Sequence, residues 1–275
     1  MTTTLRPAEP LQHHADGTRS RRYQVCVNSR PVGVTRLSTH PLFGPAVARI
    51  MELRIDEPDR GRGRGTVAAL AAEEVARAWG CERLEITVPA AEEAALRLVR
   101  ALGYAERNRG MEKQLGPTAP ALPAGTRGRP LTEAEWGPWL EHAKSGYVQS
   151  WIDRGVPAEQ ARAKSDAEHA RLLPQGPATP GMLVSVLEHD GVPVGGLWLA
   201  LGDDDRAFIY DVEADERFRG RGHGRSLMLL AEAQATAAGK NVLGLNVFRG
   251  NTPAERLYDS LGYRPVEHAF FKPLL

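Results

Sequence analysis

The sequence has few cysteines and no long hydrophobic run. Its only cysteines among 275 residues, Cys26 and Cys81, form no C-x-x-C pair and show no metal-ligand spacing, so neither a zinc site nor a disulfide framework is indicated. No stretch approaches the roughly eighteen apolar residues of a membrane-spanning helix, and the N-terminus lacks the apolar core of a signal peptide. We therefore expect a cytoplasmic protein with no membrane segment and no bound metal.

The sequence also has no large excess of positive or negative charge. The 35 Lys and Arg residues nearly balance the 34 Asp and Glu residues, which leaves a net charge of +1. No global field would attract nucleic acid or an anionic membrane, so any anion site must be local. With 42% hydrophobic residues the chain can form packed cores, and its length favours two domains over one.

An internal repeat supports the two-domain interpretation. The glycine-rich segments Arg60–Gly65 and Arg219–Gly224 lie 159 positions apart. The same displacement, without a gap from about residue 50 to 115, also pairs Ile50 with Ile209, Asp56-Glu57 with Asp215-Glu216, Ala72-Glu73 with Ala231-Glu232, Arg97-Leu98 with Arg256-Leu257, and Leu102-Gly103-Tyr104 with Leu261-Gly262-Tyr263. So long a register indicates a duplicated unit.

The segment between the copies, residues 116–130, is rich in proline and glycine and has no hydrophobic period. It is typical of a linker, although a long ordered surface loop is the alternative. The expected domains are therefore residues 1–115 and 131–275, joined by residues 116–130.

Each copy shows the order strand, glycine turn, helix, strand, helix, strand, which predicts an α/β unit. In the second copy the expected strands are 207–212, 243–248 and 268–273, the expected helices are 226–238 and 253–261, and a hairpin around Asp190-Gly191 joins strands 182–187 and 193–201. The glycine turn thus joins the end of a strand to the start of a helix.

A helix pair is expected in the second copy alone, between Thr132 and Leu173. Thr132 and Glu135 form a capping box, and a second helix is expected to start at Pro157. In the first copy only residues 13–21 could take this place, which is too short. Apolar residues recur at helical spacing and favour a buried helix face over an acceptor pocket: Trp136, Trp139, Leu140, Ala143, Tyr147 and Trp151.

A strand followed by Arg-Gly-x-Gly-x-Gly and a helix directs backbone N–H groups and the positive helix end at one spot, which suits a phosphate group. Two other phosphate motifs fit worse. Arg225 stands where a dinucleotide fold has its last glycine, and the Gly-Lys-Ser/Thr of a P-loop is absent. A glycine-rich connector with no ligand is the remaining alternative.

Two segments of the second copy resemble motifs of the GNAT superfamily of N-acetyltransferases. Arg219-Gly220-Arg221-Gly222-His223-Gly224 is similar to its Q/R-x-x-G-x-G/A motif, and Asn251, Ala254 and Leu257-Tyr258 are similar to its second half. The resemblance implies two tandem domains, each a mixed, mostly antiparallel sheet flanked by helices, with acetyl-CoA as co-substrate. It also implies that coenzyme A is bound by Val212, Ala214, Arg219, Gly220, Arg221, Gly222, His223, Gly224, Arg225, Asn251, Ala254 and Tyr258.

In the mechanism that the resemblance implies, a neutral amine attacks the thioester directly. Tyr258 would protonate the departing thiolate, and a backbone amide near Val212 or Ala214 would stabilise the oxyanion. Asp211 and Glu213 share one face of their strand, and either is a candidate base. The alternatives are that this acidic pair only orders water or attracts a cationic amine, and that Tyr258 is a core residue.

The displacement of 159 positions also allows the site residues of the second copy to be compared with their equivalents in the first copy. Glu92 stands there in place of Asn251, and Val99 stands in place of Tyr258. We therefore expect a non-catalytic first domain, which either keeps a coenzyme site or has become structural. The whole chain is expected to be a monomer or homodimer that acetylates a primary amine. A non-catalytic acyl-CoA-binding sensor or interaction protein is the alternative.

Overall fold

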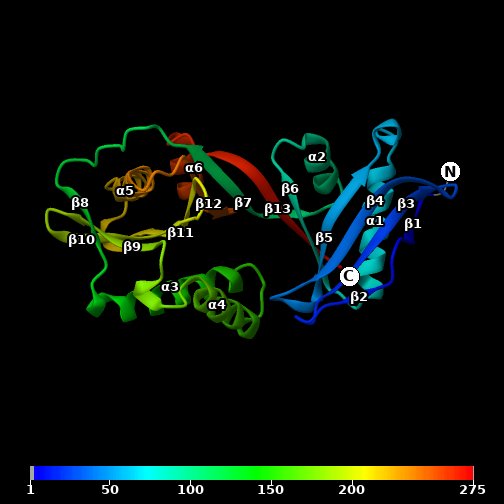
Figure 1. Ribbon diagram of the computed structural model, residues 1–275, viewed down its shortest axis with the longest axis horizontal. Coiled ribbons are helices and arrows are strands. Elements are labelled where there is room, and N and C mark those ends of the chain that lie inside the picture. Colours follow the sequence, from blue (N-terminus) through cyan, green and yellow to red (C-terminus); the bar gives the residue numbers. More distant parts are fainter. Residues whose placement is uncertain (1–2, 275) are drawn as a thin grey trace. The chain divides into compact units, whose positions relative to one another are not determined.

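The computed structural model describes residues 3–274 and divides into two compact units (Figure 1). The first unit contains the described residues of Met1–Arg109 together with those of Val266–Leu275, and the second contains Gly110–Pro265. The expected domains were two consecutive segments, with residues 266–275 in the second. The structure instead groups these residues with the first unit, because the strand that they form pairs with a strand there.

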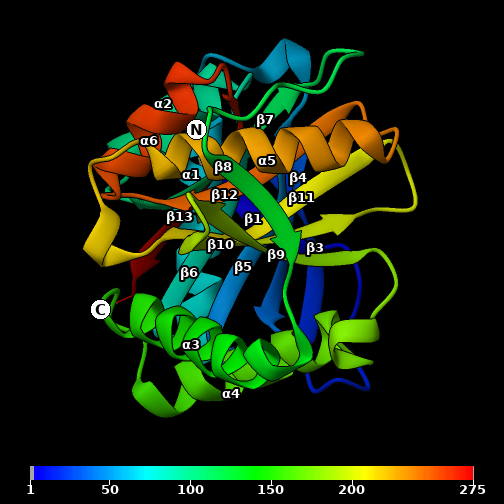
Figure 2. The same cartoon turned by 90° about the vertical axis from the view of Figure 1, so that its left-hand side faces the viewer.

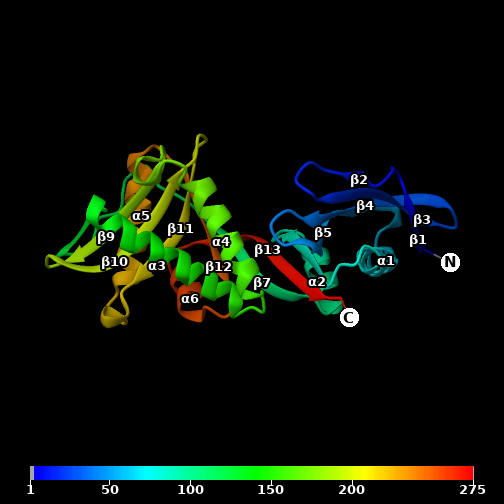
Figure 3. The same cartoon turned by 90° about the horizontal axis from the view of Figure 1, so that it is seen from below.

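The first unit is a sheet with helices α1 and α2 on one side (Figure 3). Its strand order is β1-β3-β4-β5-β6-β13, with β2 paired to β3. The elements are β1 (Thr3–Pro7), β2 (Gln12–His13), β3 (Arg19–Val27), β4 (Arg30–His40), β5 (Gly44–Ile55), η1 (Glu57–Asp59), α1 (Arg64–Ala78), β6 (Arg83–Pro89), α2 (Glu93–Ala101) and most of β13 (Arg264–Pro273).

The second unit has the strand order β7-β12-β11-β10-β9-β8. Helices α3 and α4 lie on one face of β9–β11, and α5 lies on the other (Figure 2). The elements are the end of β7 (Ala105–Gln114), β8 (Thr126–Pro130), α3 (Glu133–Ile152), α4 (Ala158–Leu172), η2 (Gly176–Ala178), β9 (Met182–His189), β10 (Val192–Leu201), β11 (Arg206–Ala214), η3 (Glu216–Phe218), α5 (His223–Ala237), β12 (Val242–Phe248) and α6 (Thr252–Ser260).

Each unit is completed by the last strand of the other copy. Strand β13 pairs antiparallel with β6, with Phe270 opposite Ile86, and β7 is the neighbour of β12. Met111 and Phe270 are equivalent residues of the repeat, and each is 1% exposed, Met111 in the core of the second unit and Phe270 in that of the first. The duplicated pattern therefore fits either sheet, because both sheets offer the same apolar positions.

The tandem α/β architecture predicted from the sequence is confirmed, and so are several local features. Asp190 and Gly191 have φ values of 49° and 78°, as a tight two-residue hairpin turn requires, and Thr132 and Glu135 form the expected capping box. The expected linker differs in one respect: its last residues form β8, which pairs antiparallel with β9. No helix within residues 3–274 is both long enough and apolar enough to cross a membrane.

Candidate active site

The candidate site begins where two parallel strands of the second unit part. Strand β11 pairs with β12 from Arg206 to Ile209, so within the described part of the chain residues 210–214 have no strand partner on that side. A β-bulge lies at the same point, because Trp198 of β10 is opposite Asp211 whereas Leu199 is opposite Ile209, which leaves Tyr210 as the extra residue. The open edge carries the backbone of Val212 and Ala214, which the sequence predicts to contact the coenzyme arm.

The glycine turn follows at the end of β11 and leads into α5. Gly220 and Gly222 have φ values of 77° and 86°, and a Cβ added at either would meet no atom within 4 Å. Glycine is therefore required there by backbone conformation. At Gly224 a Cβ would lie 3.4 Å from Leu257 Cδ2 of α6, so this glycine lets the two helices pack closely.

The first turn of α5 fits a pyrophosphate group. Gly222 is the N-cap and His223 the first helical residue, and the first four N–H groups of a helix have no acceptor within it. The first hydrogen bond within α5 runs from the amide of Ser226 to the carbonyl oxygen of Gly222 at 3.1 Å, so the amides before Ser226 have no acceptor in the helix. The backbone of the predicted residues 222–225 can therefore donate to an anion, with the helix dipole in support.

The arginine side chains of this turn are held in different ways. The Arg219 guanidinium lies 2.7 Å from Glu216, and Arg225 Nη2 donates to Ser260 Oγ at 2.6 Å. The Arg221 guanidinium lies 5.6 Å from the centre of the Phe218 ring. Charge around the turn thus comes from arginines that local contacts already orient.

His223 is buried in the turn. Its ring centre lies 5.2 Å from that of His189 and 6.3 Å from that of Phe218. Burial, with the neighbouring His189 and Arg221, lowers the pKa of His223. The neutral imidazole therefore fills space beneath the turn and adds no charge to it.

Helix α6 brings Asn251 and Tyr258 to the site. Asn251 Oδ1 accepts from the Ala254 amide at 3.3 Å, so the side chain caps the helix. Tyr258 follows after two helical turns, is 7% exposed, and packs in the core of the unit beside Tyr263. The alternative that Tyr258 serves packing therefore has direct structural support.

Asp211 influences Tyr258 electrostatically. Burial raises the pKa of Tyr258 to about 12, and the Asp211 carboxylate adds to this rise. Burial also raises the pKa of Asp211 to about 6, with a further contribution from Glu213. The tyrosine thus keeps its proton at neutral pH, whereas the carboxyl group can gain or lose one there.

His142 is a candidate that the sequence reasoning missed. It lies on α3, and its Nε2 is 2.7 Å from Glu213 Oε2 on β11. The hydrogen bond with Glu213 raises the pKa of His142, and Asp211 also acts in this direction. The only sequence signal was helical spacing, since His142 follows Trp139 by three positions and so shares its face.

Aromatic side chains form a wall under α3 and α4. Trp139 of α3 contacts Trp198 at 5.6 Å between ring centres, and Trp198 contacts Tyr210 at 5.0 Å. Trp151 is buried against Phe248 of β12. These tryptophans attach the helix pair to the sheet, and Trp139 and His142 together place one face of α3 over the bulge and Glu213.

The corresponding place in the first unit has different chemistry. Strands β5 and β6 also part after Ile50, with the same bulge at Met51. Glu52, the counterpart of Asp211, lies 3.8 Å from both Arg22 and Arg54. The side chain of Arg60 donates to the Ile55 carbonyl at 2.9 Å, and Ile55 is the counterpart of Ala214. In the first unit, therefore, arginine side chains neutralise Glu52, and the Arg60 side chain covers the backbone at the end of β5.

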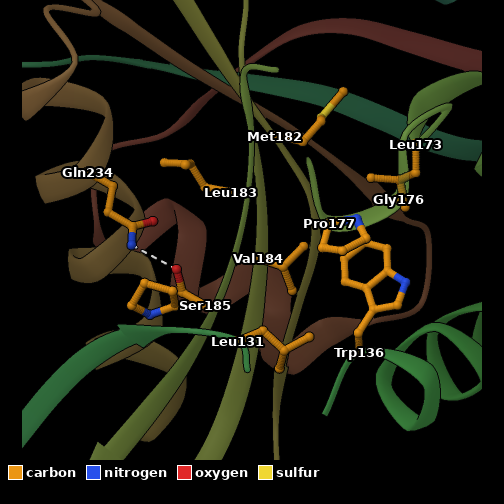
Figure 4. Close-up of a pocket in the computed structure, with 11 residues that line it drawn as sticks. Leu131, Trp136, Leu173, Gly176, Pro177, Met182, Leu183, Val184, Ser185 and Gln234 are labelled. Carbon is orange, nitrogen blue, oxygen red and sulfur yellow. Dashed lines mark hydrogen bonds between the residues drawn. The ribbon is translucent and has the colours of Figure 1, made fainter. Parts of the chain in front are cut away.

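A cavity of about 240 Å³ lies elsewhere in the second unit (Figure 4). It is bounded by β9, η2 and Trp136, and Gln234 of α5 donates to Ser185 Oγ at its edge at 2.8 Å. None of the predicted site residues lines it. This cavity is therefore separate from the candidate site at the parted strands.

The glycine turn and the tyrosine on the next helix are features of the acyl-CoA-dependent N-acyltransferases that the sequence resembles, and in this structure both lie near the parted strands. The chain belongs to the GNAT acetyltransferase family: the family model described as "Acetyltransferase (GNAT) family" matches residues 2–104 and 136–263. Both copies of the repeat are thus members, and the chain is a tandem GNAT protein.

Individual relatives agree with this assignment. The mycothiol acetyltransferase of Beutenbergia cavernae is 29% identical over 234 residues, which cover 82% of this chain and 76% of that protein. The uncharacterised N-acetyltransferase YycN of Bacillus subtilis is 28% identical over 150 residues, 53% of this chain and 96% of that protein. These homologues support a general N-acetyltransferase activity.

Solved structures with low sequence identity share the fold. A GCN5-related N-acetyltransferase from Sphaerobacter thermophilus has a TM-score of 0.61 at 19% identity, and the match covers 92% of this chain and 80% of that one. A tandem GNAT protein from the clavulanic acid biosynthesis pathway has a TM-score of 0.52 at 19% identity, covering 94% and 84%. The cytoplasmic setting and the oligomeric state stay predictions.

Proposed function

We propose that the second unit transfers an acetyl group from acetyl-CoA to a primary amine by direct attack. The observation that carries this proposal is the electrostatic coupling of Asp211 to both Tyr258 and the Glu213–His142 pair at the point where β11 and β12 part. This coupling supports a site in which a proton acceptor for the amine and a proton donor for the thiolate act near the glycine turn.

Acetyl-CoA supplies an activated thioester, and the residues present fit it. The amides at the start of α5 would hold the pyrophosphate, and the open edge of β11 at Val212 and Ala214 would hold the pantetheine arm. Asn251, Ala254 and Tyr258 of α6 would line the other side of that arm. A backbone N–H on the open edge would stabilise the oxyanion.

The reaction requires several proton transfers. Asp211 takes a proton from the incoming ammonium group, and the free amine then attacks the carbonyl carbon. As the N–C bond forms and the C–S bond breaks, Tyr258 gives its proton to the sulfur, and the remaining surplus proton on nitrogen replaces it. The products are an amide, a thiol and one proton released to solvent.

A free-thiol release assay with acetyl-CoA and a panel of amines tests the proposal. Wild-type protein should release thiol only when an acceptor is present, and Tyr258→Phe should abolish most of that release. The buried packing of Tyr258 favours a second candidate, a non-catalytic acyl-CoA sensor. Binding of acetyl-CoA without thiol release for any amine would support the sensor and contradict the enzyme.

A further inference from the structure

Among the residues that the structure describes, the acidic pair of the second unit, Asp211 and Glu213, forms no ion pair with Lys or Arg. Within residues 3–274, the ion pair formed by this group of side chains is the one between Glu213 and His142. The nearest cation on α3, Lys144, bonds to Asp166 of α4 at 2.8 Å. The repeat gives the contrast, because Arg54 replaces Glu213 in the first unit and lies beside Glu52.

Asp211 is the member of this pair that forms no ion pair among the described residues, and its partly buried carboxylate next to Glu213 is unfavourable unless a cation lies beside it. Asp211 is half-buried and its pKa is raised to about 6, which records the unfavourable environment for a second negative charge next to Glu213. Positive charge brought between the two carboxylates would relieve this repulsion. An alkylamine, which is protonated at neutral pH, supplies that charge, whereas an arylamine does not.

His142 controls where Glu213 can lie. Glu213 has 43% of its side chain exposed and would otherwise sample several rotamers. The 2.7 Å hydrogen bond from His142 Nε2 restrains one carboxylate oxygen, while the other stays available. Trp139, one helical turn away, packs against Trp198 of β10 and thereby attaches α3 to the sheet.

From these contacts we propose that His142 is a positioning residue that holds Glu213 beside Asp211, and that the resulting pair binds the acceptor as an alkylammonium ion. This inference rests on the proposed function, since it names the acceptor class of the same site. The ammonium group would lie between the carboxylates, with Asp211 nearest to the reacting centre and able to take its proton. Glu213 anchors the acceptor.

Benzylamine and aniline are matched probes, because they differ mainly in charge at neutral pH. For the wild-type chain, KM should be at least tenfold lower for benzylamine. Glu213→Gln and His142→Leu should each raise the benzylamine KM about tenfold, the equivalent of one charge-assisted hydrogen bond, and leave the aniline KM unchanged. His142→Gln keeps a donor and should retain most of the affinity. Glu141→Gln, which removes the same charge at an exposed position of α3, is the control and should change neither KM.

Calorimetry on the full chain separates this inference from the proposed function. Benzylamine should bind at least tenfold more tightly than benzyl alcohol, its neutral analogue, and this preference should disappear in Glu213→Gln. Equal binding of the two, or binding of neither, overturns the cation site. Thiol release without preference for benzylamine over aniline also overturns it but leaves the acetyltransferase proposal standing. A preference for benzylamine in calorimetry, with no thiol release for any amine, supports the cation site and contradicts the enzyme.

Discussion

Lys113 Nζ lies 2.7 Å from Glu232 Oε1, although 119 positions separate the two residues. The equivalent pair of the repeat, Lys272 and Glu73, is joined at 2.8 Å in the first unit. Each lysine stands on the strand contributed by the other copy, β7 or β13. The exchange of strands therefore leaves both buried glutamates paired, because duplication placed the same lysine on each strand.

This pairing predicts a stability effect. Glu232→Gln leaves Lys113 without its charged partner in a mostly buried position, and should lower the free energy of unfolding by about 1–3 kcal/mol. Glu73→Gln should have a similar effect. Glu74→Gln is the control, because the Glu74 side chain is 74% exposed, and should change stability by less than about 0.5 kcal/mol. Urea unfolding measures all three, and equal values for Glu232→Gln and Glu74→Gln would contradict the argument.

The glycine turns allow a matched pair of substitutions. Gly222→Ala and Gly63→Ala each place a Cβ on a residue with positive φ, so each should cost about 1–2 kcal/mol of stability. Only Gly222→Ala should also raise the KM for acetyl-CoA, by about tenfold or more. Melting temperature and initial rates give the two readouts. A similar loss of activity in both variants would show that folding, and not the anion site, is responsible.

Tyr258→Phe should lower kcat by about 100-fold or more with little change in the KM for acetyl-CoA, because it removes a proton donor but keeps the packing. Tyr104→Phe in the first unit is the control, since that tyrosine is equally buried and its pKa is also raised. It should affect stability alone. An unchanged kcat in Tyr258→Phe would remove this hydroxyl from the mechanism.

The rate should depend on pH through Asp211. A base with a pKa of about 6 is protonated below that value, so kcat/KM should rise with pH through about 6 and then level off. Tyr258, with a pKa of about 12, should cause no decline up to about pH 10. Rates measured from pH 5 to 9 test this, and a profile with no acidic limb would exclude Asp211 as the base.

The raised pKa of Asp211 also affects stability. Between its unfolded pKa of about 4 and its folded pKa of about 6, the folded state binds more proton, so stability falls as pH rises. Asp211→Asn should therefore increase the free energy of unfolding by about 1–2 kcal/mol above pH 6 and have little effect at about pH 4. Urea unfolding at the two pH values is the measurement, and an equal effect at both would contradict it.

The first unit should not bind acetyl-CoA. Arg60 covers the Ile55 carbonyl, Glu92 replaces Asn251, and Arg64 at the start of α1 forms an ion pair with Asp59. Calorimetry on the full chain should therefore give a stoichiometry near one, and Gly222→Ala should abolish most of the signal. A stoichiometry near two, with one site left in Gly222→Ala, would show that the first unit keeps its own site.

Local features of this protein were predictable from neighbouring residues. The repeat placed the glycine turns, and capping, turn and periodicity patterns placed α3, the β9–β10 hairpin and α5. Each depends on backbone conformation or on spacing within one element. Alternation along one strand placed Asp211 and Glu213 on the same face, whereas Tyr258 was named from the resemblance to the GNAT superfamily.

What the sequence determined by itself is the duplication, the glycine turn and the loss of Tyr258 from the first copy. Only the tertiary structure decided that β7 and β13 are exchanged, because equivalent strands fit either sheet equally well by pattern. Only the structure brought His142 to Glu213, since that contact joins residues 71 positions apart through the packing of α3 on β10. Pairings between distant elements depend on packing, which no local pattern records.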